Sequence, residues 1–296
     1  MLRAATRGSA LARWQTQHVS ALLADRHGEG VDEVIVSTLG DRDKSTPLHE
    51  IGGKGVFVKE VQAAVLDGRA DIAVHSGKDL PAETPEELVL VAVPVRGDAR
   101  DALVGCTWDG LPPGAHVATG SVRRRSQMAW LRPDLRFSEL RGNVPTRMEK
   151  AVDFDAIVVA SAAIDRLEID APVIDRLDPS VMVPQVAQGA LAIECRADDS
   201  ATIERLRAIE DAASRRAFDA ERAFLSELGG DCDLPAGAHA VLHDDEIELV
   251  GMLATLDGRV LIRERRTGTV PEALGRSVAR FLLDDAGGTD LLADAR

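Results

Sequence analysis

The chain has 296 residues, enough for about two domains, and 45% of them are apolar, which allows sizeable cores. Its net charge of −14 argues against general nucleic-acid binding, because affinity for a phosphate backbone needs a broad basic surface. The sequence has neither an apolar run of about 18 residues nor a signal-peptide pattern, so we expect a cytoplasmic protein that does not cross a membrane.

The first hundred residues alternate between helix and strand patterns. A helix is expected to begin after Ser9, whose side chain can cap it. Residues 34–36 and 71–75 are apolar runs typical of buried strands, and between them Val58, Val61 and Val65 share one face of a predicted helix. This alternation predicts an α/β layer.

A second α/β series begins near residue 98. Apolar runs at 102–104, 117–118 and 156–160 predict strands, and residues 121–131 predict a helix. Polar turns directly follow strands in both series, and ligands collect at the carboxyl ends of strands in open α/β sheets. We therefore expect two ligand-binding crevices.

From about residue 211 the pattern changes to one helix, three strands and a last helix. The strands are expected near residues 240–242, 247–250 and 260–262, with Asp257-Gly258 as a two-residue hairpin turn between the last two. The last helix starts near Pro271 and would cover one face of the sheet. These elements predict a small C-terminal α+β domain.

The most unusual local feature is a basic segment, residues 119–150, which holds eight Lys or Arg against three Asp or Glu in an otherwise acidic chain. Seven of the eight are arginine, whose guanidinium donates two parallel hydrogen bonds to a carboxylate or phosphate. The segment therefore indicates a pocket for a ligand with such groups. A solvated helix face is the alternative.

Two further segments are candidates for chemistry. Ser76, Lys78 and Asp79 bring a hydroxyl, an ammonium and a carboxylate within four positions after a predicted strand, and such a carboxylate can hydrogen-bond an N–H or stabilise a cation. The alternative is a surface ion pair. Residues 52–55 hold three glycines, which permit close approach to a ligand or form a plain flexible turn, and they do not make a Walker loop.

Cys232 lies in a glycine-rich loop, which makes it a better candidate for covalent chemistry than Cys106 or Cys195. Its acidic neighbours, Asp231 and Asp233, disfavour the thiolate, so an electrophile must be very reactive or held in place by other groups. The spacing of Cys232 and two later histidines is only vaguely like that of a metal site, and no fourth ligand is evident. We expect reduced thiols and no metal.

Taken together, these segments resemble the porphobilinogen deaminase (hydroxymethylbilane synthase) family along essentially the whole chain. The matching runs are residues 5–12 (ATRGSALA), 52–60 (GGKGVFVKE), 70–76 (ADIAVHS), 78–81 (KDLP), 121–124 (SVRR), 140–144 (LRGNV), 146–147 (TR), 188–190 (QGA) and 193–196 (IECR). The resemblance implies head-to-tail condensation of four porphobilinogen molecules into hydroxymethylbilane in tetrapyrrole (haem) biosynthesis, with release of ammonia. It also implies a dipyrromethane cofactor.

The resemblance assigns roles to residues. Asp79 would be catalytic with Arg7 and Lys78, and Cys232 would carry the cofactor through a thioether. The cofactor-binding set is Cys232, Asp79, Lys78, Ser76, Thr119, Ser121, Arg123, Arg124 and Lys54, and the substrate-binding set is Arg7, Ser9, Arg141, Arg147, Asn143 and Phe57. Each porphobilinogen ring has an acetate and a propionate, so the growing chain gains carboxylates that guanidinium groups can bind. Phe57 either stacks on a ring or packs in a core.

Five positions depart from the pattern usual in the family: Gly77, Gly120, Pro145, Ala187 and Asp231. Gly77 and Gly120 each lack a side chain beside the proposed site. Asp231 changes the charge next to the anchoring cysteine. Whether these residues alter activity or cofactor assembly is left open.

The family fold implies two similar doubly wound α/β domains of the periplasmic-binding-protein type and a small C-terminal α+β domain. We place the catalytic domain at 1–97 with 186–208, the carboxylate-binding domain at 98–185, and the domain with the cofactor cysteine at 209–296. We expect a monomer that binds the small molecule porphobilinogen and neither nucleic acid nor membrane. Transient docking of uroporphyrinogen III synthase is left open.

Two other functions are compatible with the residues alone. One is a non-catalytic, two-lobed anion-binding protein, which would need no covalently bound pyrrole on Cys232. The other is a transferase for a phosphate ligand that uses the glycine segment and the arginines.

Overall fold

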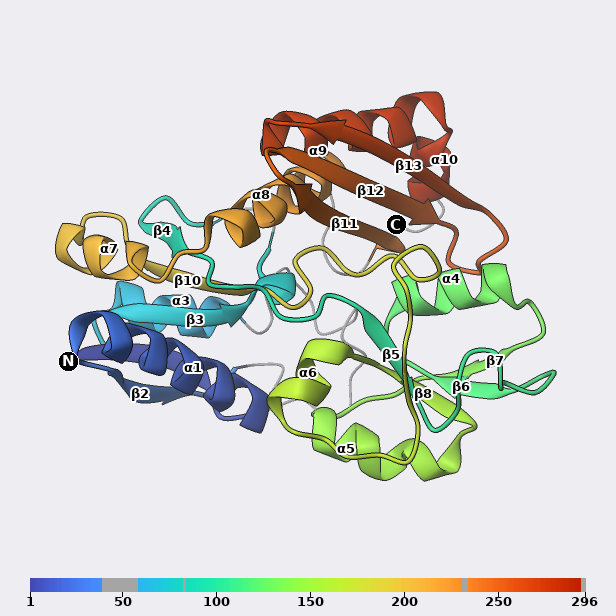
Figure 1. Cartoon of the computed structure of the whole chain (residues 1–296), viewed down its shortest axis with the longest axis horizontal. Coiled ribbons are helices and arrows are strands. Elements are labelled where there is room, and N and C mark those ends of the chain that lie inside the picture. Colours follow the sequence, from blue (N-terminus) through green and yellow to red (C-terminus); the bar gives the residue numbers. More distant parts are fainter. Residues whose placement is uncertain (39–57, 82–83, 230–233, 294–296) are drawn as a thin grey trace. The chain divides into compact units, whose positions relative to one another are not determined.

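The structure is a computed structural model that describes residues 1–38, 58–81, 84–229 and 234–293 (Figure 1). The strands are β1 (Leu2–Arg7), β2 (Val31–Val36), β3 (Ile72–Ser76), β4 (Leu88–Ala92), β5 (Asp101–Val104), β6 (His116–Ala118), β7 (Arg136–Ser138), β8 (Ala156–Ala160), β9 (Ile174–Arg176), β10 (Leu191–Arg196), β11 (Ala236–His243), β12 (Glu246–Ala254) and β13 (Leu261–Gly268). The helices are α1 (Ala10–His27), α3 (Lys59–Leu66), α4 (Val122–Leu131), α5 (Val144–Glu149), α6 (Ser161–Arg166), α7 (Ser200–Arg207), α8 (Ala212–Glu227), α9 (Pro271–Arg280) and α10 (Gly288–Ala293). Among the described residues, every helix is too short or too polar to cross a membrane.

The chain folds as two compact units. The first comprises Met1–Gly97 and Ala190–Arg215, and the second comprises Asp98–Gly189 and Arg216–Arg296. Each unit is therefore built from two separate stretches of sequence. The boundaries of the three predicted domains stay a prediction.

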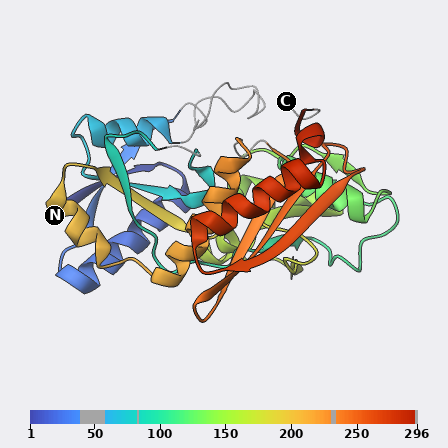
Figure 2. The same cartoon turned by 90° about the horizontal axis from the view of Figure 1, so that it is seen from above.

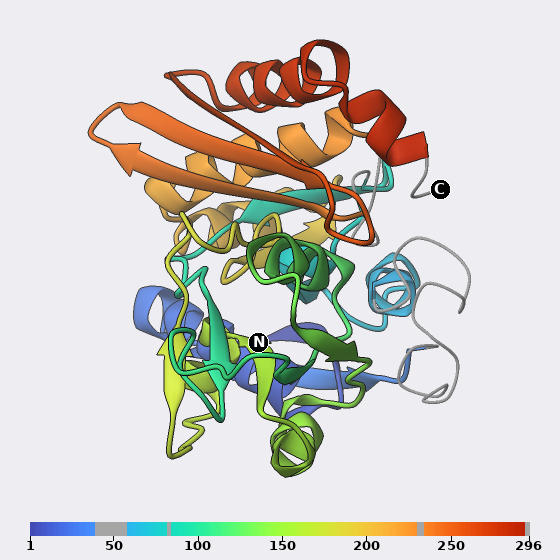
Figure 3. The same cartoon turned by 90° about the vertical axis from the view of Figure 1, so that its right-hand side faces the viewer.

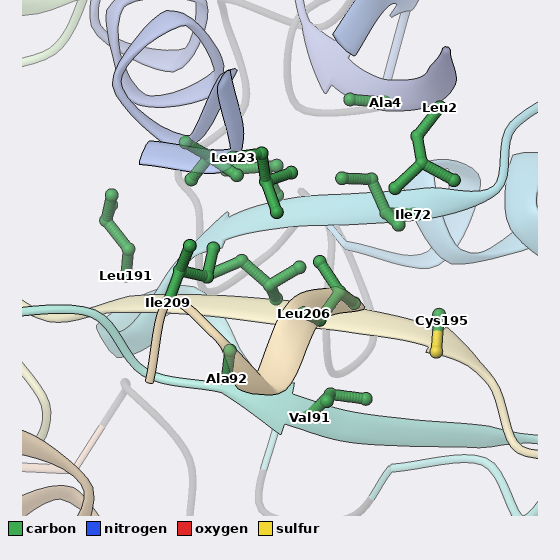
Figure 4. Packing of buried hydrophobic residues seen from close by; sticks show 13 residues of the cluster. Leu2, Ala4, Leu23, Ile72, Val91, Ala92, Leu191, Cys195, Leu206 and Ile209 are labelled. Atoms are coloured by element: carbon green, nitrogen blue, oxygen red, sulfur yellow. The ribbon is translucent and has the colours of Figure 1, made fainter. Parts of the chain in front are cut away.

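The first unit contains a five-stranded sheet in the order β2-β1-β3-β10-β4, in which only β10 runs antiparallel to its neighbours. α1 and α7 cover one face, where Leu23 and Leu206 pack with Ile72 (Figure 4). α3 covers the other face through Val61 and Val65. Because successive strand residues point to opposite faces, a strand covered on both sides reads as the continuous apolar run seen in the sequence.

Local signals in the sequence set the bounds of α1. The Ser9 hydroxyl accepts a hydrogen bond from the Ala12 N–H at 3.3 Å, which confirms the predicted cap. The helix ends at His27, and its C-cap Gly28 adopts the left-handed conformation at φ 74° that glycine tolerates best. The end of β1 and the start of α1 are thereby held at one edge of the sheet.

The second unit contains a sheet with the same plan. Its order is β7-β6-β8-β5-β9, with β6 parallel to β7 and β8, and with β5 antiparallel to β8 and β9. In both sheets the one antiparallel strand is therefore the fourth in the order. Two similar α/β sheets were expected from the sequence, and this part of the fold class is confirmed.

The C-terminal part of the second unit is a three-stranded antiparallel sheet, β11-β12-β13, as predicted. Figure 2 shows α9 lying across this sheet. α8 lies on the same face, since Phe224 of α8 and Val278 of α9 both border the position where a side chain at Gly251 of β12 would stand. The predicted α+β layer is confirmed.

The predicted two-residue turn at Asp257-Gly258 is wrong. The connection runs from Thr255 to Val260, closed by a hydrogen bond from the Thr255 N–H to the Val260 carbonyl at 2.9 Å. Gly258 lies in this longer turn with φ 71°, close to the backbone of α4. Figure 3 shows the turn between β12 and β13 near α4. The longer connection packs against α4, and the residues of the turn itself give no sign of this contact.

The tight turn of this sheet lies instead between β11 and β12. His243 pairs with Glu246, so Asp244 and Asp245 form the connection. Asp244 has φ 53°, and aspartate tolerates this region better than most side chains. An Asp-Asp pair is a weaker turn signal than Asp-Gly, and the sequence analysis missed it.

Replacing Gly275 by alanine is expected to lower the free energy of unfolding by about 1–3 kcal/mol. The new Cβ would overlap the Ala220 carbonyl oxygen and lie 2.8 Å from the Ala223 Cβ, so α8 and α9 would have to separate. This cost exceeds the gain of about 1 kcal/mol from alanine in a helix. In the control Gly268→Ala, the Cβ would make an ordinary contact at 3.6 Å with Leu274. Urea unfolding of both variants checks this, and equal stabilities would contradict it.

Candidate active site

Five of the predicted site residues lie at one edge of the sheet in the first unit. The neighbouring parallel strands β1 and β3 end at Arg7 and Ser76. Ser9 follows β1 as the cap of α1, and one 3₁₀ turn, η1 (Gly77–Asp79), follows β3 and carries the predicted lysine and aspartate. The carboxyl ends of these parallel strands thus bring together two segments that lie almost 70 residues apart in the sequence.

The 3₁₀ turn η1 is fixed to the sheet by its backbone. The Gly77 N–H donates to the Ala190 carbonyl at 2.9 Å, directly before β10, and the Leu80 N–H donates to the Gly77 carbonyl at 3.3 Å. Gly77 and Leu80 are buried, whereas Lys78 and Asp79 are half-buried. These backbone hydrogen bonds fix the turn to the sheet, while the side chains of Lys78 and Asp79 stay accessible to a ligand.

The other predicted residues that the structure describes lie at the corresponding edge of the second unit. β6 ends at Ala118 and is followed by Thr119 and α4. Its parallel neighbour β7 ends at Ser138 and leads to α5. The residues gathered at this edge are Thr119, Ser121, Arg123, Arg124, Arg141, Asn143 and Arg147.

Several polar side chains of this edge also hold the backbone. Ser121 Oγ accepts from the Arg124 N–H at 3.5 Å, which caps α4 as expected for a helix over 121–131. Asn143 Oδ1 accepts from the Thr146 N–H at 3.0 Å, which caps α5. Pro145 lies in the first turn of α5, where a backbone N–H has no partner within the helix, so this departure from the family pattern fits the fold.

Gly120 brings the two connections of this edge close together. A Cβ at this position would lie 2.9 Å from the Leu140 carbonyl oxygen and 3.0 Å from Glu139 Oε1. A serine, usual in the family, would require a shift of the Leu140 backbone. Gly120 thus allows the segment before Arg141 to pack closely against the β6–α4 turn.

Arg123 and Arg124 are buried around a carboxylate that the sequence analysis did not single out. Asp101 is fully buried, with Oδ2 2.8 Å from Arg123 Nη1 and Oδ1 2.8 Å from Arg124 Nη2. Gln188 Nε2 also donates to Asp101 Oδ1 at 2.8 Å. Burial acts to raise the pKa of Asp101, but the two guanidinium charges hold it well below its usual range.

Three buried N–H groups of the arginines at this edge have no hydrogen-bond acceptor among the described residues. Arg123 Nε and Nη2 and Arg141 Nη1 are buried, and none of them has a hydrogen-bond partner in the described part of the chain. Buried N–H groups are almost always paired, since leaving one unpaired costs about 1–3 kcal/mol. Carboxylates of a bound molecule would satisfy these donors, so the edge is suited to an anionic ligand.

Lys54, Phe57 and Cys232 lie outside the described residues, as does Asp231. Burial raises the pKa of the Cys195 thiol to about 11, so this thiol is a poor nucleophile.

Sequence reasoning missed Asp101 and gave no role to Glu194, a second buried carboxylate. The available signal was an acidic residue within or beside a run of apolar strand residues.

Comparison with known proteins identifies the family. The model "Porphobilinogen deaminase, dipyromethane cofactor binding domain" matches residues 2–204, and "Porphobilinogen deaminase, C-terminal domain" matches residues 216–284. The chain belongs to the porphobilinogen deaminase family. The activity is porphobilinogen deaminase (hydroxymethylbilane synthase) activity in tetrapyrrole biosynthesis, with a dipyrromethane cofactor.

Full-length porphobilinogen deaminases are similar to the whole chain. The protein of Roseiflexus castenholzii is 45% identical over 296 residues, covering 97% of each chain. That of Brevibacillus brevis is 44% identical, covering 98% of this chain and 96% of its own. A solved structure, the methionine-binding protein MetQ, aligns with a TM-score of 0.44 at 13% identity, over 74% of this chain and 94% of that chain. The family assignment therefore rests on sequence, and it sets aside the anion-binding and phosphate-transferase alternatives.

Proposed function

We propose that Asp79 is the catalytic carboxylate of this porphobilinogen deaminase. The observation that supports it best is the common sheet edge at which β1 and β3 end, with Arg7 on one strand and Ser76 and η1 on the other. A carboxylate there can accept a hydrogen bond from a pyrrole N–H and stabilise the positive charge that develops when ammonia leaves porphobilinogen. Arg7 assists by holding a substrate carboxylate and by helping to move a proton to the leaving amine, and Lys78, beside Asp79 in η1, assists by binding carboxylates.

The second unit would supply most of the carboxylate recognition. Arg141 and Arg147 flank the cap of α5, and we assign them with Asn143 to the acetate and propionate groups of the substrate. Arg147 Nε donates to the Gly142 carbonyl at 2.8 Å, which orients its guanidinium. Ser9 and Phe57 complete the proposed substrate set.

The residues present suit a dipyrromethane, which when bound would supply a free α-carbon as the nucleophile to which the first substrate pyrrole is joined as ammonia leaves. We assign its carboxylates to Arg123, whose buried Nε and Nη2 lack partners among the described residues, and to Arg124, with Thr119 and Ser121. Arg124 would act mainly through position, since Asp101, Gln188 and the Val158 carbonyl already surround its guanidinium. Lys54, Ser76 and Lys78 complete the proposed cofactor set.

Cys232 is the proposed anchor. The purified protein should be heavier under denaturing conditions by the mass of two linked pyrrole rings, and Cys232→Ala should lack this excess. Intact mass spectrometry makes the comparison, with Cys106→Ala as the matched thiol control. A protein that stays without excess after incubation with porphobilinogen or hydroxymethylbilane would contradict the proposed anchor.

The family and the sequence support a proposal for the location and the oligomeric state of the protein. We infer a cytoplasmic monomer, and light scattering coupled to gel filtration measures the oligomeric state. Uroporphyrinogen III synthase would consume the product, and its transient docking would appear as a change in sedimentation when the two proteins are mixed.

A further inference from the structure

Glu194 of β10 is a fully buried carboxylate in the first unit, and it gathers three side chains. Gln62 Nε2 donates to Oε2 at 2.9 Å, and Thr84 Oγ1 donates to Oε1 at 3.2 Å. His75 Nε2 lies 3.1 Å from Oε2. Both carboxylate oxygens therefore have partners from other segments.

Two of the three partners of Glu194 lie close to the proposed catalytic turn in the sequence, one before it and one after it. His75 lies in β3 directly before Ser76 and η1, and Thr84 follows the turn by five positions. Gln62 belongs to α3, which packs on the face of the sheet where Ala73 points, so His75, two positions on, faces the same way. Glu194 thus contacts the chain both before and after Asp79, and it also contacts α3, the helix that covers this face of the sheet.

The electrostatics keep this carboxylate charged. Burial acts to raise the pKa of Glu194, but His75, Gln62 and Thr84 together lower it below its usual value. A buried carboxylate is rarely the most stable choice for a core, because well-packed apolar residues often replace a buried ionic network without loss. The presence of Glu194 in the core is therefore better explained by positioning of the neighbouring chain than by a gain in stability.

We propose that Glu194 is a positioning residue that fixes η1, and so sets the position of Asp79 relative to the substrate. The inference rests on the proposed role of Asp79. Groups that hold a reacting carboxylate affect the chemical step far more than substrate binding, since a misplacement of about 1 Å can cost about 100-fold in rate. Substrate affinity should depend mainly on the arginines.

The test is Glu194→Gln, which keeps size and shape but removes the charge. We expect kcat to fall about 10- to 100-fold, with KM for porphobilinogen changed less than about twofold. The mass excess of the bound pyrroles should remain. Hydrogen–deuterium exchange of the peptide spanning Ser76 to Leu80 should become faster, a readout that does not depend on activity.

Two further variants keep the test decisive if Glu194→Gln folds poorly. Thr84→Val keeps the shape of the side chain and removes only the bond to Oε1, so it should shift kcat and exchange in the same direction by a smaller factor. Glu33→Gln, which removes an exposed pair with Arg13 in the same unit, should change neither.

The outcomes separate this inference from the proposed function. Unchanged kcat and exchange in Glu194→Gln and Thr84→Val, beside an inactive Asp79→Asn, would overturn the positioning role alone. Wild-type turnover in Asp79→Asn would overturn the proposed function itself. A rise in KM with unchanged kcat would also contradict the inference, because it would show an effect on binding rather than on the chemical step.

Discussion

Asp79→Asn is expected to abolish turnover and leave the fold intact. The change keeps the shape of a half-buried side chain in η1 and removes the charge that we assign to the stabilisation of the reacting pyrrole. Positioned acid or base groups contribute about 10²- to 10⁴-fold, so the rate of hydroxymethylbilane formation should fall by at least about 100-fold. A stopped assay of product with the cofactor-loaded protein measures the rate, and circular dichroism checks the fold.

The matched control is Asp67→Asn, at the exposed end of α3 in the same unit, where Asp67 lies 3.3 Å from Arg69. The Asp67→Asn variant should form hydroxymethylbilane at the rate of the unmodified protein. The Asp79→Ala variant should be as inactive as Asp79→Asn. If either Asp79 variant turns over at the normal rate, Asp79 has no part in the mechanism.

Asp101→Asn is expected to cause the largest loss of stability, about 3–5 kcal/mol in the free energy of unfolding. The carboxylate lies between Arg123 and Arg124, and its removal would leave two buried guanidinium groups without a counter-charge. Arg123 would also lose its orientation, so less cofactor should bind. Urea unfolding measures the stability and intact mass the cofactor content. In the control Asp134→Asn, an exposed pair with Arg132 is lost, and little should change.

The same carboxyl predicts a pH dependence. Its pKa in the folded protein is below the ordinary value, so its contribution to stability is fully present above about pH 4 and is lost as the pH falls further. Between about pH 5 and pH 3, the unmodified protein should therefore lose stability more steeply than Asp101→Asn. Parallel slopes for the two proteins would show that Asp101 does not titrate in this way.

The elements predicted from the sequence are those whose burial leaves a local pattern. β3 and β8 are covered on both faces, so each reads as an apolar run, and α1 has a capping serine at its start. β7 (Arg-Phe-Ser) and β9 (Ile-Asp-Arg) are short and contain no apolar run, so neither leaves a strand signal in the sequence. β1 contains two arginines and two alanines, and its place in the sheet comes from pairing with β2 and β3 rather than from its own composition.

The candidate site shows the same limit. Polar residues just after strands could be assigned to the sheet edge, because topology alone places them there. Asp101 and Glu194 could not, since their partners come from distant segments: Gln188 is 87 positions from Asp101, and Gln62 is 132 positions from Glu194. A single acid in an apolar strand has no local mark that distinguishes a positioned carboxylate from an exposed one.

The place of β10 in the first sheet has a consequence for the way the chain folds as it leaves the ribosome. β10 lies between β3 and β4, yet it is made only after the whole α/β part of the second unit. At about 5–20 residues per second, β4 must wait roughly 5–20 s for the strand that will pair with it. During that time β3 and β4 each present an unpaired edge to other chains. The yield of folded protein should therefore depend on chaperones more strongly than its final stability suggests.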